Sequence, residues 1–173
     1  MTRKKTFSLL LATAAVALVA LVVAGCGGGD HQATAASANP SGSTLAVSDA
    51  GDLGKILVDS QGRTVYLFEK DSGPMSTCSG ACAQEWPPVT TSGKPTAGGD
   101  LDESMVGTTK RSDGTTQVTY NGHPLYRFYA DNAAGDTAGQ GVDAFGAKWY
   151  VLSPAGDRVT GSSGGGGGGS YPY

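Results

Sequence analysis

One segment of this chain occurs twice, and this duplication limits the possible folds more than any other feature. Residues 62–71, GRTVYLFEKD, align without gaps on residues 122–131, GHPLYRFYAD, at an offset of 60. Val58 and Val118 match upstream at the same offset. Similarity at a fixed period marks one supersecondary unit that is used twice. We therefore expect a domain built from two similar halves.

Each unit has the pattern of a β-hairpin. In the second copy the β-rich runs 118–120 and 125–128 are separated by Asn121-Gly122. This dipeptide is the strongest short hairpin signal, because both of its residues tolerate positive φ. The first copy repeats the order of strand, turn and strand around residues 60–62. The pattern predicts two equivalent hairpins.

After the hairpin, each unit crosses a polar loop and returns through an apolar run that begins at Trp86 or Trp149. Further strands are expected over 105–109 and 115–120, and no long helical periodicity follows residue 25. The sequence therefore predicts a mostly β fold, a small single domain of two similar β-hairpin or meander repeats. We place this domain at 45–160, with repeat 1 at about 54–90 and repeat 2 at about 115–156.

The repeated aromatic residues predict the core. Residues two apart on a strand point to the same face, so one apolar face carries Tyr66 and Phe68 in the first copy, and Tyr126 and Phe128 in the second. The opposite face is apolar in the first copy and carries Arg127 in the second. The first strand should therefore be covered on both sides, and the second should be partly wet on one side.

An aspartate, Asp71 or Asp131, follows each repeated Phe by three residues, where the strand should end. Aspartate at such a position commonly accepts hydrogen bonds from nearby backbone amides and stops the strand. A tyrosine hydroxyl could be a second partner. The alternative is a carboxylate pair across the two halves that performs acid–base catalysis.

The N-terminus is an export signal. Three basic residues precede an apolar run over 7–23, and small residues lead to Cys26. Val-Ala-Gly-Cys26 resembles the lipobox of bacterial lipoproteins, which implies cleavage after residue 25, a diacylglycerol on the Cys26 sulfur and an acyl chain on its amine. Several acyl chains hold a soluble domain on a membrane where one chain is marginal. The alternative is an uncleaved anchor, although 7–23 is short and weakly apolar for a span.

Composition restricts the partners of the mature chain. Residues 1–25 hold three of the 12 basic residues and none of the 15 acidic ones, so cleavage leaves a clearly acidic chain. Its basic residues are scattered singly, which argues against nucleic acid and against electrostatic attachment to anionic lipid. Residues 26–44 are expected to be the acylated cysteine and a flexible tether. The glycine-rich segment 161–173 is expected to be a disordered tail.

The repeat and the lipobox together resemble the bacterial secreted-repeat lipoproteins with the Yx(F/W/Y)xxD motif. The run from Cys78 through Cys82 to Trp86-Pro-Pro also resembles the first-repeat pattern of that family. The resemblance covers about residues 54–156. It implies an exported, membrane-anchored repeat domain whose family has no established biochemical activity, so it supplies no catalytic residues.

Cys78 and Cys82 are the two thiols that remain after acylation of Cys26. A pair of cysteines in an exported protein predicts a disulfide. The alternative is a redox-active pair, but three intervening residues depart from the thioredoxin spacing of two. No histidine follows Cys82, as haem attachment would require.

Metal ligands are few in the sequence. His31 lies in the tether, and His123 stands alone beside a turn. Asp131, Asp136 and Asp143 offer oxygen ligands for calcium, but the spacing of an EF-hand and its terminal glutamate are missing. We therefore expect no metal and no cofactor.

The sequence also lacks the Gly-x-Ser-x-Gly elbow of serine hydrolases. We expect a lipid-anchored extracytoplasmic protein that is not an enzyme, with a binding or structural role and either an envelope protein or a small molecule as its partner. The alternative is an accessory redox or cofactor-binding lipoprotein that uses its cysteines or aromatic residues.

Overall fold

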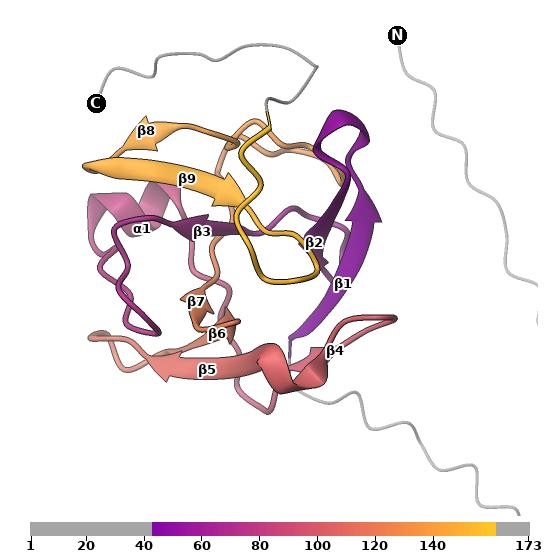
Figure 1. The fold of residues 1–173 in the computed structure, drawn as a ribbon. Helices are drawn as coiled ribbons and strands as arrows, with labels where there is room; N and C mark the ends of the chain where they lie inside the picture. The colour runs from indigo at the N-terminus through magenta and orange to yellow at the C-terminus, as the bar shows by residue number, and fades with distance from the viewer. Residues whose placement is uncertain (1–42, 162–173) are drawn as a thin grey trace, which may run out of the picture. The chain divides into compact units, whose positions relative to one another are not determined.

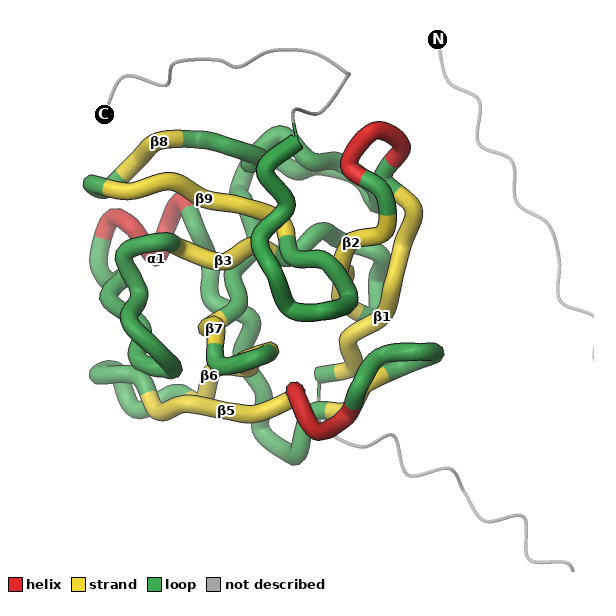
Figure 2. Tube along the Cα trace, in the orientation of Figure 1, coloured by secondary structure: helices red, strands yellow, loops and turns green. Residues whose placement is uncertain are grey.

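A computed structural model describes residues 43–161 of the chain (Figure 1). The predicted signal peptide over 1–25, the acylated Cys26, nearly all of the tether and residues 162–173 of the tail lie outside the described residues. Within 43–161 the fold is mostly β, as the sequence predicts (Figure 2). In this part of the chain no helix has the length and apolar character needed to cross a membrane.

Each half of the described chain contributes six short elements. The first half holds β1 (Thr44–Asp49), the 3-10 turn η1 (Gly51–Leu53), β2 (Lys55–Asp59), β3 (Tyr66–Phe68), α1 (Ala81–Glu85) and β4 (Thr96–Ala97). The second half holds η2 (Glu103–Met105), β5 (Val106–Lys110), β6 (Thr116–Tyr120), β7 (His123–Pro124), β8 (Asp143–Ala144) and β9 (Ala147–Val151). The strands β1 to β9 form three sheets of three strands, ordered β2-β1-β4, β3-β9-β8 and β5-β6-β7.

The hairpin predicted at Asn121-Gly122 is present between β6 and β7. Tyr120 pairs with His123, and the two turn residues have φ values of 46° and 78°. Positive φ at both central positions is the requirement of a tight two-residue hairpin turn, and it explains why Asn and Gly occupy them.

The turn of the first copy is one residue longer, which corrects the upstream alignment. Val65 N donates to Leu57 O, and Leu125 N donates to Val118 O in the same way. The structural counterpart of Val118 is therefore Leu57 and not Val58. The ungapped alignment matched two valines by type, but one extra turn residue moves Val58 to the other face of its strand.

The two halves exchange strands. β3 of the first half pairs with β9 of the second (Figure 1). In this register Phe68 lies opposite Trp149. In the reciprocal arrangement, residues 125–129 bond to the return segment 85–89, through contacts such as Val89 N to Leu125 O at 2.9 Å and Arg127 N to Pro87 O at 2.9 Å. Each tyrosine-bearing segment thus pairs with the return segment of the other repeat.

Tyr66 and Tyr126 lie where the exchanged segments meet. Tyr66 N donates to Tyr126 O at 2.8 Å, and Tyr126 N donates to Tyr66 O at 3.0 Å. This reciprocal pair of backbone hydrogen bonds relates the two halves by an approximate twofold axis. The halves are therefore joined by main-chain pairing as well as by side-chain packing.

Two clusters of buried side chains lie on opposite faces of the central strands. Along β2, Ile56 and Val58 enter the first cluster, whereas Leu57 between them enters the second. Tyr66 and Phe68 also lie in the first cluster, and the alternate residues of their strand lie in the second. This alternation follows the two-residue period of a strand, and it covers the first Tyr-x-Phe segment on both faces.

Candidate functional site: two crossed tyrosine–aspartate pairs

Four aromatic rings form a continuous stack in the core. The centroid of Phe68 lies 4.0 Å from that of Trp149, which lies 3.9 Å from Trp86, which in turn lies 4.3 Å from Phe128. The rings alternate between the two repeats, and all four are buried. The repeated aromatic residues therefore build the interface between the halves and do not form an exposed platform.

The two tyrosines pack with their edges against this stack. The Tyr66 ring lies 5.4 Å from Trp86 of its own repeat, and the Tyr126 ring lies 5.1 Å from Trp149 of its own repeat. Both rings stand nearly perpendicular to the indole, with interplanar angles of 80° and 88°. Edge-to-face contacts of this kind are favourable beyond the apolar area that they bury.

Each phenol then crosses to the aspartate of the other repeat. Tyr66 Oη donates to Asp131 Oδ2 at 2.6 Å, and Tyr126 Oη donates to Asp71 Oδ2 at 2.5 Å. The sequence suggests a tyrosine as a partner of each aspartate, but it does not show that the partner comes from the other copy. The two carboxylates bind different phenols, and no direct contact between them is found within residues 43–161.

The second oxygen of each aspartate holds the loop that follows the strand. Asp71 Oδ1 accepts from the backbone N and the hydroxyl of Thr77, both at 2.7 Å. Asp131 Oδ1 accepts from Ala138 N at 2.9 Å. Both aspartates thus serve as turn residues, in the role that their position at the end of a strand predicts.

The surroundings of these groups shift their proton affinities. Burial, together with the neighbouring carboxylate, raises the pKa of both Tyr66 and Tyr126 well above the usual value, so both phenols are neutral hydrogen-bond donors. Burial also raises the pKa of Asp131 to about 6, although hydrogen bonds from Tyr66 and from the Ala138 amide favour its charged form. Asp131 therefore titrates close to neutral pH.

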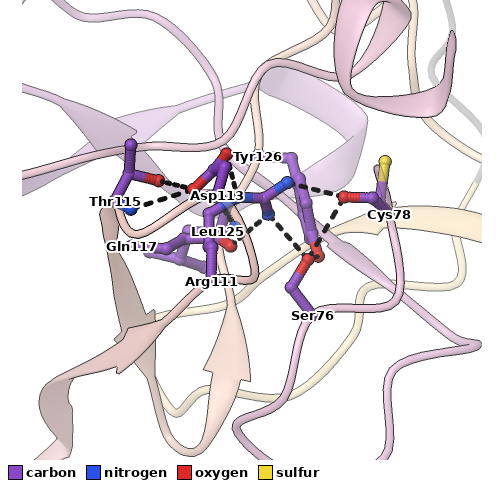
Figure 3. Close-up of polar contacts among 8 residues, drawn as sticks. All are labelled: Ser76, Cys78, Arg111, Asp113, Thr115, Gln117, Leu125 and Tyr126. Atoms are coloured by element: carbon purple, nitrogen blue, oxygen red, sulfur yellow. Dashed lines mark hydrogen bonds and ion pairs between the residues drawn. The ribbon is translucent and has the colours of Figure 1, made fainter. Parts of the chain in front are cut away.

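A buried arginine is linked to one of the pairs (Figure 3). The Arg111 side chain is only 4% exposed. Its Nη1 donates to Ser76 Oγ and to Gln117 Oε1, both at 2.7 Å, and its Nη2 donates to the Cys78 carbonyl at 2.6 Å. The nearest acid, Asp113, lies 3.5 Å away and is itself exposed. Neutral acceptors therefore satisfy most of this guanidinium.

Ser76 connects the arginine to the pair of Tyr126 and Asp71. Its Oγ lies 2.7 Å from Tyr126 Oη. Because Tyr126 has a single phenol proton and donates it to Asp71, the serine must be the donor in this contact. At the equivalent place in the other repeat, Tyr66 accepts from Gly139 N at 3.3 Å. Within residues 43–161, the polar network that includes Arg111 is thus linked to the pair of Tyr126 and Asp71 and not to the other pair.

Sequence reasoning did not identify Arg111. Its sequence context, Lys110-Arg111-Ser-Asp-Gly, has the composition of a polar surface turn, and the first repeat has no arginine at the corresponding position. Arg111 is buried with acceptors on Ser76 and Cys78, which lie more than 30 residues earlier in the chain. The sequence around Arg111 therefore does not predict these contacts.

The predicted disulfide between Cys78 and Cys82 is present, with a Cα–Cα distance of 5.3 Å. It joins the loop before α1 to the first turn of that helix, and both cysteines are buried. The Cys78 carbonyl that binds Arg111 belongs to the same loop. The disulfide therefore fixes one side of the arginine's binding site.

The loop considered for calcium forms an ordinary turn. Asp136 Oδ2 accepts from the backbone N of Asn132 and of Ala133, both at 2.8 Å. Across residues 43–161 no cluster of three or more His, Cys, Asp and Glu side chains is arranged to hold a metal ion. His123 lies on β7, and His31 falls outside the described residues.

Among the open clefts on the surface of residues 43–161, two differ clearly in their lining. The first has a volume of about 340 Å³. Its lining includes Phe68 and Asp71 of the first Tyr-x-Phe-x-x-Asp motif, together with Glu69, His123, Asp157 and Arg158. The second is a groove of about 650 Å³ with a lining rich in hydroxyl groups: Ser43, Ser60, Thr90, Thr91, Thr115 and Thr116. The first cleft adjoins one of the tyrosine–aspartate pairs, and the second offers neutral polar groups to solvent.

Comparison with protein families agrees with the duplicated architecture. Residues 47–90 and 107–153, together more than half of the chain, match the model of a family described as a secreted repeat of unknown function. Each match contains a hairpin, a Tyr-x-Phe-x-x-Asp motif and a return segment. Searches of curated proteins and of solved structures gave no match. With two copies of the matching unit, the chain belongs to this family of secreted repeats of unknown function.

Proposed function

We propose that the protein is a lipid-anchored module on the outer face of a cell membrane, and that it acts by binding and not by catalysis. The observation that supports this proposal is the hydrogen bonding of the tyrosines and aspartates that both copies of the repeat share. Both oxygens of Asp71 and of Asp131 accept hydrogen bonds inside the domain. Both phenols are buried, neutral and engaged. The motif thus supports a rigid domain, and it presents no free acid–base pair.

The anchor is tested at Cys26. Changing Cys26→Ser removes the sulfur that would carry diacylglycerol, and each lost acyl chain weakens membrane attachment. The parent chain should incorporate a labelled fatty acid and sediment with membranes, whereas the variant should do neither. A parent chain that carries no fatty acid would contradict lipid anchoring. A variant that stays in the membrane would favour an uncleaved apolar anchor over 7–23.

The hydroxyl-lined groove is the proposed binding face. Serine and threonine hydroxyls each donate and accept, so a groove formed by them suits a neutral polyhydroxylated ligand such as an envelope glycan strand. The lining residues of this groove carry no charge. Ser43 contributes to it, so a bound ligand would lie at the end of the domain where the tether joins.

Internal hydrogen bonds hold part of this groove in place. Ser43 Oγ donates to Thr90 O at 2.8 Å, and Ser43 N donates to Thr91 Oγ1 at 3.3 Å. Thr91 Oγ1 in turn donates to Gly93 O at 2.8 Å. A lining that is fixed before binding loses less conformational entropy when a ligand arrives.

Binding is tested with the mature chain carrying Cys26→Ser and with isolated cell-wall glycan, by calorimetry and co-sedimentation. Thr90→Val and Ser60→Ala each remove an exposed hydroxyl of the groove, and the exposed Thr160→Val serves as the matched control. Both groove variants should weaken binding, and the control should not. Equal binding by the two groove variants and the control, or no binding by the parent, would contradict the proposal that the groove binds the glycan. Chemical conversion of the glycan would reject the non-enzymatic role.

A further inference from the structure

We propose that the core of the domain is a path for one-electron oxidation, in which Tyr126, Trp149, Trp86 and Tyr66 pass an electron vacancy between two tyrosines. This property goes beyond the binding role, because it uses the interior of the domain and not the hydroxyl-lined groove. The two tryptophans in the path are the two tryptophans of the whole chain. The path starts at the motif tyrosine of one repeat and ends at that of the other.

The rings of the path are in direct contact. The centroid distance is 5.1 Å from Tyr126 to Trp149, 3.9 Å from Trp149 to Trp86, and 5.4 Å from Trp86 to Tyr66. Tyrosine and tryptophan are the aromatic side chains that lose an electron most readily, and electron transfer between rings in contact needs no bridging group. Phe68 and Phe128 cover the two outer faces of the indole pair. Phenylalanine is much harder to oxidise, so these caps confine the vacancy to the path.

Each terminal tyrosine has a base that can take its proton. Oxidation makes a phenol strongly acidic, so the proton must leave as the electron leaves. Tyr126 Oη lies 2.5 Å from Asp71 Oδ2, and Tyr66 Oη lies 2.6 Å from Asp131 Oδ2. In the balanced step the tyrosine gives one electron to the oxidant and its phenol proton to the carboxylate. The products are a neutral tyrosyl radical, a carboxylic acid and the reduced oxidant, and returning the electron reverses both transfers.

The two indole groups between the tyrosines do not stabilise the electron vacancy. Trp86 Nε1 is buried and has no hydrogen-bond partner in the described part of the chain. Trp149 Nε1 donates to the Ala144 carbonyl at 3.3 Å, which is a weak base. Neither oxidised indole can readily lose its proton, so the vacancy moves on to a tyrosine that can.

One end of the path lies beneath an open cleft. Asp71, the proton acceptor of Tyr126, lines the cleft of about 340 Å³, and Phe68 is another of its lining residues. Arg158 forms an ion pair with Glu69 in this cleft, which leaves Asp71 and Asp157 without a balancing arginine or lysine in the lining. A surplus of negative charge attracts positive ligands. The oxidant that fits is therefore a cationic one-electron acceptor.

Tyr120 provides the internal control. It is also buried, but its hydroxyl donates to the Pro154 carbonyl at 2.8 Å, and an amide carbonyl cannot take the proton. Tyr120 also belongs to the second core cluster, whereas the indole pair lies in the first. It shares the burial of the path tyrosines, but among residues 43–161 its hydroxyl donates to no carboxylate, and its ring stacks on neither indole.

The test is flash oxidation by photoexcited ruthenium tris-bipyridine, a cationic one-electron oxidant, with detection by transient absorption and electron paramagnetic resonance. The protein is the mature chain carrying Cys26→Ser, with four further tyrosines changed to Phe to remove direct oxidation: Tyr129, Tyr150, Tyr171 and Tyr173. We expect a neutral tyrosyl radical that Tyr120→Phe leaves unchanged and that Tyr126→Phe with Tyr66→Phe abolishes. Trp149→Phe should leave the radical on Tyr126 and remove it from Tyr66. A radical insensitive to these changes would overturn the proposal.

The proton acceptor is tested separately. Asp71→Asn keeps an oxygen that accepts a hydrogen bond but cannot take the proton. Oxidation of Tyr126 should therefore slow about 100-fold, which is at the low end of the rate enhancement that a positioned general base provides. Asp102→Asn, a change at an exposed carboxylate that caps η2, should not alter the rate. In the chain that carries only the four Phe changes and Cys26→Ser, the oxidation should also be slower in heavy water, a measurement that needs no change at Asp71. Equal rates for Asp71→Asn and its parent, or in light and heavy water, would overturn the proposal.

Discussion

The phenol of Tyr126 donates a hydrogen bond of 2.5 Å to Asp71, a residue 55 positions earlier in the chain and in the other repeat. Tyr66 forms the reciprocal bond to Asp131. Each Tyr-x-Phe-x-x-Asp motif is therefore completed by its partner copy. One copy alone would leave a phenol and a carboxylate unpaired at the edge of the core, which gives a physical reason for the duplication.

Loss of the Tyr126 phenol tests this pairing. Tyr126→Phe keeps the edge contact with Trp149 but leaves Asp71 Oδ2 and Ser76 Oγ without that partner. We expect a loss of about 1–3 kcal/mol in the free energy of unfolding, measured by urea denaturation. Tyr120→Phe, which removes one bond to a carbonyl, should cost about 1 kcal/mol. A Tyr126→Phe variant as stable as its parent would show that the crossed bond does not stabilise the fold.

The aromatic stack gives a larger expected effect. Phe68 and Phe128 are 2% and 3% exposed, and each stacks on an indole of the other repeat. Truncation of either to Ala should cost about 3 kcal/mol, because it leaves a cavity as well as removing apolar contacts. Met75→Ala, at a side chain 71% exposed, is the control and should be close to neutral. If truncation of both phenylalanines left the free energy of unfolding nearly unchanged, the stacked rings would not stabilise the core.

The pKa of Asp131 predicts a pH dependence of stability. The folded pKa is about 6 and the usual value is 3.8, so the folded state binds this proton more tightly than the unfolded state does. The stabilising contribution is therefore complete below about pH 4 and is lost as the pH rises through about 6. Asp131→Asn should remove this fall in stability between pH 4 and 7.

The same pKa is measurable directly by carbon NMR of the Asp131 carboxyl group. Tyr66→Phe removes a hydrogen bond that lowers this pKa, so the value should rise further. Asp136→Asn removes a negative charge that raises the pKa, and the value should fall. A titration of Asp131 near pH 4 in the parent chain would contradict the effect of burial.

The repeat, the mostly β class and the hairpin at Asn121-Gly122 could be predicted from the sequence, because each depends on local pattern. Alternation along a strand and a two-residue turn are properties of adjacent residues. The exchange of strands could not be predicted in this way. An isolated hairpin is equally consistent with pairing to its own return segment, and the choice depends on contacts such as Phe68 with Trp149 that lie far apart in the chain.

The buried guanidinium is the clearest long-range feature, and it yields a sharp prediction. Arg111→Met removes the donor shared by Ser76, Gln117 and the Cys78 carbonyl. Loss of one member of a buried charged network typically costs about 3–5 kcal/mol, although an apolar replacement of similar size can recover part of this. Arg158→Met, at an exposed ion pair with Glu69, is the control and should change stability by at most about 1 kcal/mol. Equal effects of the two substitutions in thermal unfolding would show that the internal network does not stabilise the domain.

Strand exchange predicts that neither repeat folds alone. A fragment over 43–99 contains β3 without its partner β9, and a fragment over 100–161 contains residues 125–129 without the segment 85–89. Each fragment should give the circular dichroism and the narrow amide NMR dispersion of an unfolded chain, since its half of the aromatic stack has no opposing rings. An equimolar mixture should recover a dispersed spectrum and a tryptophan signal that reports Trp86 stacked on Trp149. Phe68→Ala in the first fragment should weaken this association, and Met75→Ala should not. A single fragment that folds without the other would contradict the conclusion that the two copies form one interlocked unit.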